Sequence, residues 1–231
     1  MNKFGSRFEE YIAESISRTN TKYLREDEIN PFLKGDKCID FVIAEGDDVI
    51  FMDAKATEVK TYEKITQSSS SIQDRIKGNI LKAIEQAYSV YSHFDEFSEE
   101  LNLTSGKVIP YILVVTYKEY FIGNGVTLFH SIAKDKIQTI QAKYSSVNIP
   151  LENIYCITID NFDMMTEQVR LGNLKYADIL KEAIKADSDN STKCYCFDIH
   201  LSEQKIGGMP DWIYQENKAL LSDVMMLYKK K

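Results

Sequence analysis

Two oppositely charged residues, Asp53 and Lys55, stand at the end of an apolar run in the stretch FMDAKATEVK, residues 51–60. A charge buried in such a run costs several kcal/mol unless it is paired or bound to a metal. If the run is a β-strand, its side chains alternate between two faces, and Asp53 and Lys55 point the same way. The spacing therefore predicts a carboxylate and an ammonium side by side at one end of a sheet.

A second carboxylate, Asp40, stands alone in the apolar stretch CIDFVIA, residues 38–44. The residues EGDD, 45–48, separate the two apolar runs and supply the Gly and Asp of a tight turn, which predicts an antiparallel hairpin. Asp40 and Asp53 are then expected to converge at one end of the sheet.

Two converging carboxylates are ligands for a hard cation such as Mg²⁺, which takes oxygen ligands and keeps several waters. The carbonyl of Ala54 is a further candidate oxygen. A metal held this way polarises a phosphodiester and activates a water, while an ammonium such as that of Lys55 orients the water. The pattern predicts metal-assisted phosphodiester hydrolysis.

The first segment, KFGSRFEEYIAESISR, predicts an amphipathic helix, with Phe4, Phe8, Ile12 and Ile16 on one face. At about 100° per residue, Glu9 lies at the border of this apolar stripe. We expect Glu9 to face the sheet. Its neighbour Glu10 is expected to face water.

A long helix is predicted over residues 71–94, SIQDRIKGNILKAIEQAYSVYSHF, with Ser71 as its N-cap. Arg75, Asn79, Lys82 and Gln86 form one polar stripe beside its apolar face. Such a stripe suits contacts to the phosphates of a bound strand. The alternative is an ordinary solvated helix face.

The remaining segments alternate between strand and helix patterns. We expect a central strand at KVIPYILVVTY, a turn at 123–125, a helix at 126–144, a strand at NIYCITI, helices near 161–187, a strand at KCYCFDIHL and a helix from about 215. This order predicts a single α/β domain over residues 1–231, with a mixed central β-sheet flanked by helices.

Composition narrows the class of protein. The chain has 231 residues, 44% of them hydrophobic and 27% charged, which is typical of a globular protein. A net charge of −7 argues against a general polyanion binder, although a local basic surface is compatible with it. The four cysteines have no Cys-x-x-Cys spacing, and the longest apolar stretch, residues 108–115, is too short to cross a bilayer. We expect a cytoplasmic protein without a membrane partner.

Taken together, these residues resemble the core of the PD-(D/E)XK nuclease superfamily, over roughly residues 4–117. Gly5, Phe8 and Glu9 match its Gly-x-x-Phe-Glu-like stretch on the first helix. Asp40 matches the metal-binding aspartate of the hairpin, and Asp53 with Lys55 matches the Asp/Glu-x-Lys.

Gln86 is a weaker match to the Gln-x-x-x-Tyr of some members. Tyr88 and Tyr91 follow it here, so the spacing departs by one residue.

The resemblance implies a restriction-endonuclease-like core and a Mg²⁺-dependent endonuclease acting on DNA, in which Mn²⁺ substitutes for Mg²⁺. Its implied catalytic set is Glu9, Asp40, Asp53, Lys55 and Gln86, and its implied metal ligands are Asp40, Asp53, Glu9 and the Ala54 carbonyl. By analogy, the setting is restriction or phage defence, with a homodimer or a partner subunit.

Residues 118–231 are expected to complete the sheet and to add helices. Two alternatives to a DNA nuclease stay open. One is an RNA nuclease with the same site, and the other is a non-catalytic subunit that binds nucleic acid or protein.

Overall fold

The computed structural model describes residues 3–56, 76–103, 107–208 and 210–229. In these ranges five strands form one mixed sheet in the order β1-β2-β3-β4-β5. Strands β1 to β3 are antiparallel, and β3 to β5 run parallel. The strands are β1 (Lys22–Arg25), β2 (Phe41–Glu45), β3 (Asp48–Lys55), β4 (Ile109–Thr116) and β5 (Ile154–Thr158).

The predicted hairpin is confirmed as β2 and β3. Glu45 pairs with Asp48, and between them Gly46 adopts a positive φ of 75°, a conformation that glycine reaches without steric strain. The register continues to the pair Phe41 and Met52. Residue 40 therefore lies just before β2, whereas residues 53–55 extend beyond the paired part of the hairpin.

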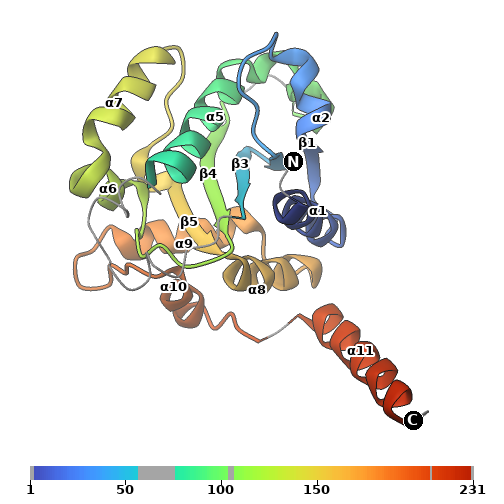
Figure 1. The fold of residues 1–231 in the computed structure, drawn as a ribbon. Helices are drawn as coiled ribbons and strands as arrows, with labels where there is room; N and C mark the ends of the chain where they lie inside the picture. The colour runs from blue at the N-terminus through green and yellow to red at the C-terminus, as the bar shows by residue number, and fades with distance from the viewer. Residues whose placement is uncertain (1–2, 57–75, 104–106, 209, 230–231) are drawn as a thin grey trace.

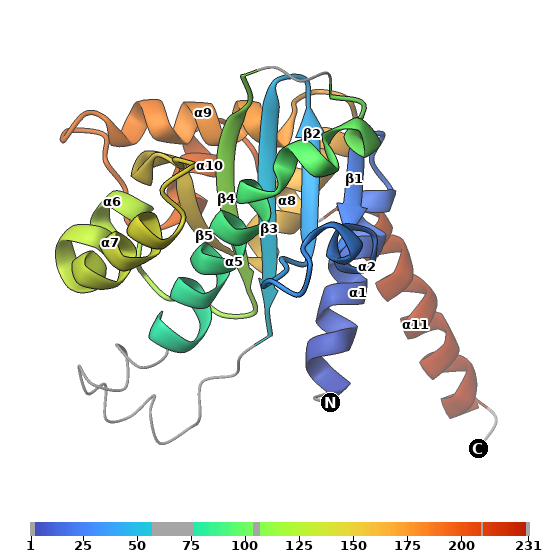
Figure 2. The same cartoon turned by 90° about the horizontal axis from the view of Figure 1, so that it is seen from above.

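Helices cover both faces of the sheet (Figures 1 and 2). On one face, α5 and α7 pack over Phe51 and Val114, and on the other α1, α8 and α9 pack over Met52 and Val115. The helices are α1 (Lys3–Ser17), α2 (Glu26–Ile29), α5 (Leu81–Ser92), α6 (Gly125–Leu128), α7 (Lys134–Lys143), α8 (Ile159–Arg170), α9 (Tyr176–Asp187), α10 (Phe197–Glu203) and α11 (Asp211–Lys229).

The strands predicted at residues 107–117 and 153–159 are confirmed as β4 and β5. β4 contributes buried residues to the cores on both faces of the sheet, as its unbroken apolar sequence predicts. The first helix and the last helix are also confirmed, and the helical segment near 161–187 consists of α8 and α9.

The strand predicted at KCYCFDIHL, residues 193–201, is wrong, because α10 forms there. Alternation would bury Tyr195 and Ile199, but these residues are 59% and 44% exposed. Phe197, His200 and Leu201, at helical spacing, are the buried residues of α10. The apolar residues Phe197 and Leu201 therefore lie on the buried face of a helix.

The long helix is confirmed only over its described part. A π-helical turn spans Ile76–Ile80 and leads into α5, whereas Ser71 and Arg75 lie outside the described residues. In the predicted turn, Gly123 has a positive φ of 71° and the side chain of Asn124 caps α6 by accepting from the Thr127 N–H at 3.0 Å.

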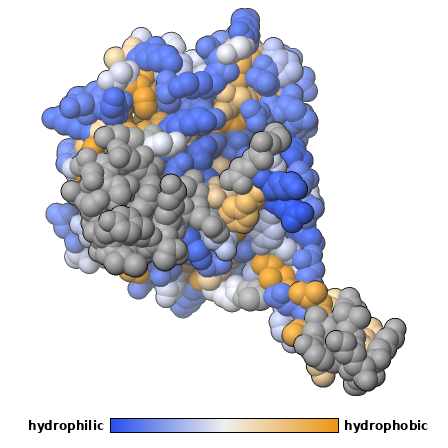
Figure 3. All heavy atoms as spheres, viewed as in Figure 1, coloured by the Kyte–Doolittle hydropathy of each residue, from blue (hydrophilic) through white to orange (hydrophobic). Residues whose placement is uncertain are grey.

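Helix α11 projects from the rest of the molecule in Figures 1 and 2. Figure 3 shows hydrophobic residues gathered on the surface where α11 leaves the body. Among the helices in the described ranges, none combines the length and hydrophobicity that a bilayer span requires.

Candidate active site

Asp53 is fully buried on β3, with an exposed fraction of 0%. Neither of its carboxylate oxygens accepts a well-oriented hydrogen bond from the described residues, although the ammonium of Lys55 contacts Oδ2 as an ion pair. Burial raises the pKa of Asp53, the negative charge of Asp40 raises it further, and Lys55 opposes both effects. This carboxyl group therefore lies where additional positive charge is favourable.

Asp40 lies opposite Asp53 across the end of the hairpin. The N–H of Ala54 donates a hydrogen bond to Asp40 Oδ2 at 2.6 Å, which fixes the Asp40 side chain beside β3. The two carboxyl groups are close enough that a protonated Asp53 would donate to Asp40, and this hydrogen bond also raises the pKa of Asp53. The predicted convergence of Asp40 and Asp53 is thus present in the structure.

The carbonyl of Ala54 points to the same side. In a strand, the N–H and C=O of one residue face the same neighbouring strand. The Ala54 N–H faces Asp40, beyond the last pair of β2 with β3. Its carbonyl oxygen therefore also faces the Asp40 side of the hairpin.

Glu9 and Asp40 line one cavity of about 310 Å³, together with residues of α2 and the segment before it. Burial raises the pKa of Glu9, and the charges of Asp40 and Glu26 raise it further. Glu10 instead binds Arg25 at 2.8 Å on the surface. Glu9 thus faces the site and Glu10 faces solvent, as their positions on α1 predicted.

Glu26, the first residue of α2, lines the same cavity and was not predicted from the sequence. Its N–H donates to the carbonyl of Asp40 at 3.0 Å, and burial followed by the charge of Asp40 raises its pKa. The sequence gives little signal for this helix start, because arginine is not a preferred N-cap residue, although in the structure the Glu28 side chain accepts from the Arg25 N–H at 2.9 Å.

Gln86 lies behind Asp40. Its Nε2 donates to the carbonyl of Cys38, two residues before Asp40, and its Oε1 is buried without a hydrogen-bond partner in the described part of the chain. Gln86 therefore positions the segment that carries Asp40. Among the described residues, no hydrogen bond joins it to Asp53.

The rest of the predicted polar stripe is divided between two settings. Asn79 donates to the hydroxyl of Tyr120 at 3.2 Å, and Arg75 lies outside the described residues. Lys82 is exposed, and its charge lowers the pKa of Glu26. α5 thus places one cation near enough to Glu26 to affect its pKa, while the Lys82 side chain lines a different cavity between α5 and α7.

The donors fit Mg²⁺ better than a transition metal. Within the described ranges, no three His, Cys, Asp or Glu residues are grouped so as to hold a metal ion, so Glu9 does not join Asp40 and Asp53 in one cluster. Mg²⁺ is usually bound by one or two carboxylates, with waters and substrate phosphate completing its shell. Asp40, Asp53 and the Ala54 carbonyl form such a set.

Comparisons with known proteins add no family to this geometry. Compared with models of protein families, with curated proteins and with solved structures, the chain shows no match.

Proposed function

We propose that this chain is a Mg²⁺-dependent nuclease that hydrolyses phosphodiester bonds of DNA and has a PD-(D/E)XK, restriction-endonuclease-like core. The observation that carries the proposal is the buried Asp53 carboxyl, which accepts no well-oriented hydrogen bond from the described residues, lies close to Asp40 and contacts Lys55. Two carboxylates this close repel each other in an interior of low polarity. A divalent cation removes that repulsion.

Each residue of the site has a role in this proposal. Asp40, Asp53 and the Ala54 carbonyl would hold the ion, which when bound polarises the phosphodiester and lowers the pKa of its water. The Lys55 ammonium orients the attacking water and offsets the charge that develops on phosphate. Glu9 supports the site from α1, and Gln86 is a positioning residue.

DNA as substrate rests on the resemblance to the nuclease superfamily. Two cations lie near the acidic cavity. Arg25 lines it, and the positive charge of Lys82 lowers the pKa of Glu26. They provide contacts for phosphate in a chain whose net charge is −7. A restriction or phage-defence role suits such an enzyme by the same analogy.

The test is cleavage of supercoiled plasmid with Mg²⁺, compared with EDTA and with the variants Asp53→Asn and Lys55→Met. We expect EDTA to abolish cleavage and each variant to lose at least about 100-fold in rate, the usual effect of removing a group that stabilises the transition state. Asp47→Asn is the matched control, because Asp47 is exposed in the turn at the opposite end of the same hairpin.

Cleavage by both variants at the parental rate would refute the proposed site. Single-stranded DNA and structured RNA are assayed in parallel. Degradation of RNA while DNA stays intact would identify RNA as the substrate and leave the proposed hydrolysis at the same site in place. Binding of DNA without cleavage under any divalent metal would instead identify a non-catalytic nuclease-fold subunit.

A further inference from the structure

A second cavity, of about 820 Å³, opens on another face of α1. Its walls come from α1, from the residue after β4, from the start of α8 and from the segment that leads into α11. α1 therefore separates this cavity from the acidic one, since Phe8 lines one and Glu9 lines the other. The proposed nuclease site leaves the second cavity without a role.

One wall of the cavity is aromatic. The ring of Tyr117 meets that of Phe4 edge-on at 5.1 Å and lies near that of Phe8 at 6.3 Å. The ammonium of Lys118 stands over the Tyr117 ring at 4.6 Å. Aromatic side chains with a cation beside them are the usual platform on which proteins stack unpaired bases.

A buried carboxyl group lies in the wall of the cavity. Asp163 is 7% exposed, and its Oδ2 accepts a hydrogen bond from the Tyr11 hydroxyl at 2.8 Å. Its Oδ1 is buried and has no partner in the described part of the chain. Because buried acceptors are nearly always satisfied, this oxygen, which is closed to solvent here, is left for a donor that comes from a water or from a bound ligand.

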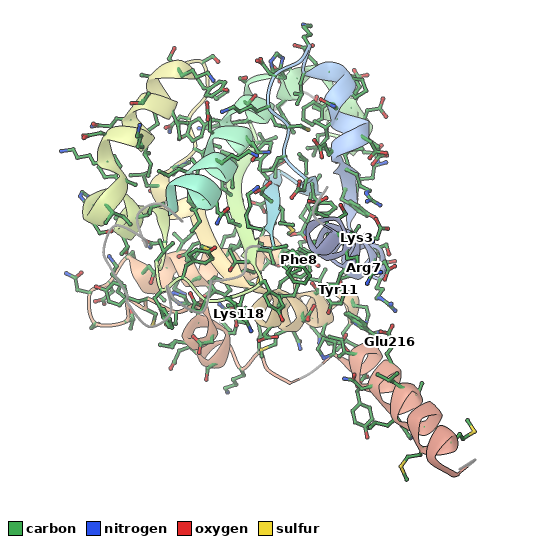
Figure 4. All side chains as sticks on the ribbon, viewed as in Figure 1. Lys3, Arg7, Phe8, Tyr11, Lys118 and Glu216 are labelled. Atoms are coloured by element: carbon green, nitrogen blue, oxygen red, sulfur yellow. The ribbon has the colours of Figure 1, made fainter. Side chains whose placement is uncertain are left out.

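Cations lie at the rim. Arg7 lines the cavity and is exposed, and Lys118 is exposed next to Tyr117. Figure 4 shows Phe8 and Tyr11 on the side of α1 near α8, with Lys118 on the same side of the molecule. The exposed carboxylate of Asp160 repels phosphate from the α8 end, so an anionic group is directed to Arg7.

We infer that this cavity binds an unstacked nucleobase that carries an exocyclic amino group, with the attached phosphate at Arg7. The amino group donates to Asp163 Oδ1, and the ring lies against Tyr117. Adenine and cytosine present the amino donor beside a ring nitrogen. Thymine presents an N–H only between two carbonyl oxygens, which a carboxylate oxygen repels.

The cavity adjoins the proposed nuclease site through β4. The N–H of Tyr117 donates to the carbonyl of Lys55 at 3.3 Å, so the aromatic wall begins next to the strand that carries Asp53. The inference rests on the proposed function in one respect, because the strand to be cut is one source of the base. A free nucleotide is the other source of the same chemistry.

The test is fluorescence anisotropy of the full-length protein in EDTA with labelled duplexes that carry one unpaired adenine, cytosine or thymine. We expect the adenine and cytosine duplexes to bind about tenfold more tightly than the thymine duplex, the effect of one hydrogen bond to a carboxylate. Competition with dAMP, dCMP and dTMP separates the sources. Displacement by dAMP and dCMP shows that a free nucleotide suffices, whereas displacement by oligonucleotide alone shows that the strand is required.

Variants separate base recognition from folding. Asp163→Asn can present an amide donor to the cavity and is expected to remove or invert the preference over thymine, which a structural role would not do. Arg7→Gln is expected to weaken all three duplexes equally and to reduce the salt dependence of binding. Asp135→Asn, on the exposed surface of α7, is the control for Asp163→Asn.

Equal affinity for the three duplexes, or an unchanged preference in Asp163→Asn, would overturn the inference. Since binding is measured without metal, the two proposals fail separately. If binding depends on the exocyclic amino group but no Mg²⁺-dependent cleavage occurs, only the proposed nuclease function is refuted. If cleavage occurs but the three duplexes bind equally, only the inferred base binding in the second cavity is refuted.

Discussion

At the scale of single residues, Asp53 stands out because its burial and the negative charge of Asp40 oppose its ionisation more strongly than Lys55 favours it. Its pKa is raised in the folded protein, so a proton is held more tightly than in the unfolded chain. In the proposed site, Mg²⁺ would have to displace that proton to bind. Metal binding is therefore expected to strengthen as the pH rises through the raised pKa and to weaken as it falls.

This dependence is measurable as thermal stability. We expect saturating Mg²⁺ to raise the unfolding midpoint by about 3–8 °C at pH 8, the range for a ligand well above its dissociation constant, and by clearly less at pH 5.5. Asp53→Asn should show little shift at either pH. A shift of the same size in parent and variant, or one independent of pH, would place the metal elsewhere.

At the scale of elements, much of the fold could be predicted because local patterns agreed with tertiary burial. The hairpin, β4 and α1 follow from apolar periodicity and turn residues alone. The same alternation predicted that Asp53 and Lys55 share a face, and their ion pair agrees with it.

Other elements depend on contacts that no local window contains. The sequence of α10 predicts a strand. In the structure, the buried His200 of α10 pairs at 3.1 Å with Asp187 of α9, a contact that no local stretch of sequence contains. β1 has four residues and gains its stability by pairing with β2. Glu26 was missed for this reason, because its place beside Asp40 depends on that pairing.

The substitution Gly125→Ala tests how tightly α6 packs against the parallel half of the sheet. A Cβ added there would lie 2.4 Å from the Leu151 carbonyl oxygen and 2.8 Å from the Ile154 Cβ, closer than real contacts allow. Gly125→Ala is expected to reduce the free energy of unfolding by about 2–4 kcal/mol, through overpacking against backbone.

Gly5→Ala is the matched control, because a Cβ on Gly5 in α1 meets nothing within 4 Å. It should stabilise the protein slightly, by up to about 1 kcal/mol, since alanine is the better helix former. Denaturant unfolding of both variants checks the pair. Equal effects of the two changes would mean that α6 does not pack closely on β5.

At the scale of the whole molecule, α11 is attached through its first two turns. The ring of Trp212 lies 5.6 Å from that of Tyr11, the guanidinium of Arg18 lies 4.5 Å from the Trp212 ring, and Arg18 also pairs with Glu216 at 3.3 Å. Farther along, Leu220 and its apolar neighbours are more than half exposed. The body therefore gains little stability from the far part of this helix.

Removal of residues 218–231 is accordingly expected to change the free energy of unfolding by less than about 0.5 kcal/mol, the range for exposed positions. Removal of residues 207–231, which takes Trp212 away, should destabilise the protein measurably. Thermal unfolding and light scattering check both forms. If removal of residues 218–231 causes a large loss of stability, or a change in oligomeric mass by light scattering, the exposed face of α11 is an interface in the intact protein.

The hydrogen bond between Tyr11 and Asp163 joins positions 152 residues apart. Ribosomes add about 5–20 residues per second, so α1 leaves the ribosome roughly 8–30 s before α8 exists to receive it. An isolated helix of this length is barely stable in water. During synthesis the apolar face of α1 is therefore exposed while the sheet assembles, so a better supply of chaperones is expected to raise the yield of folded protein.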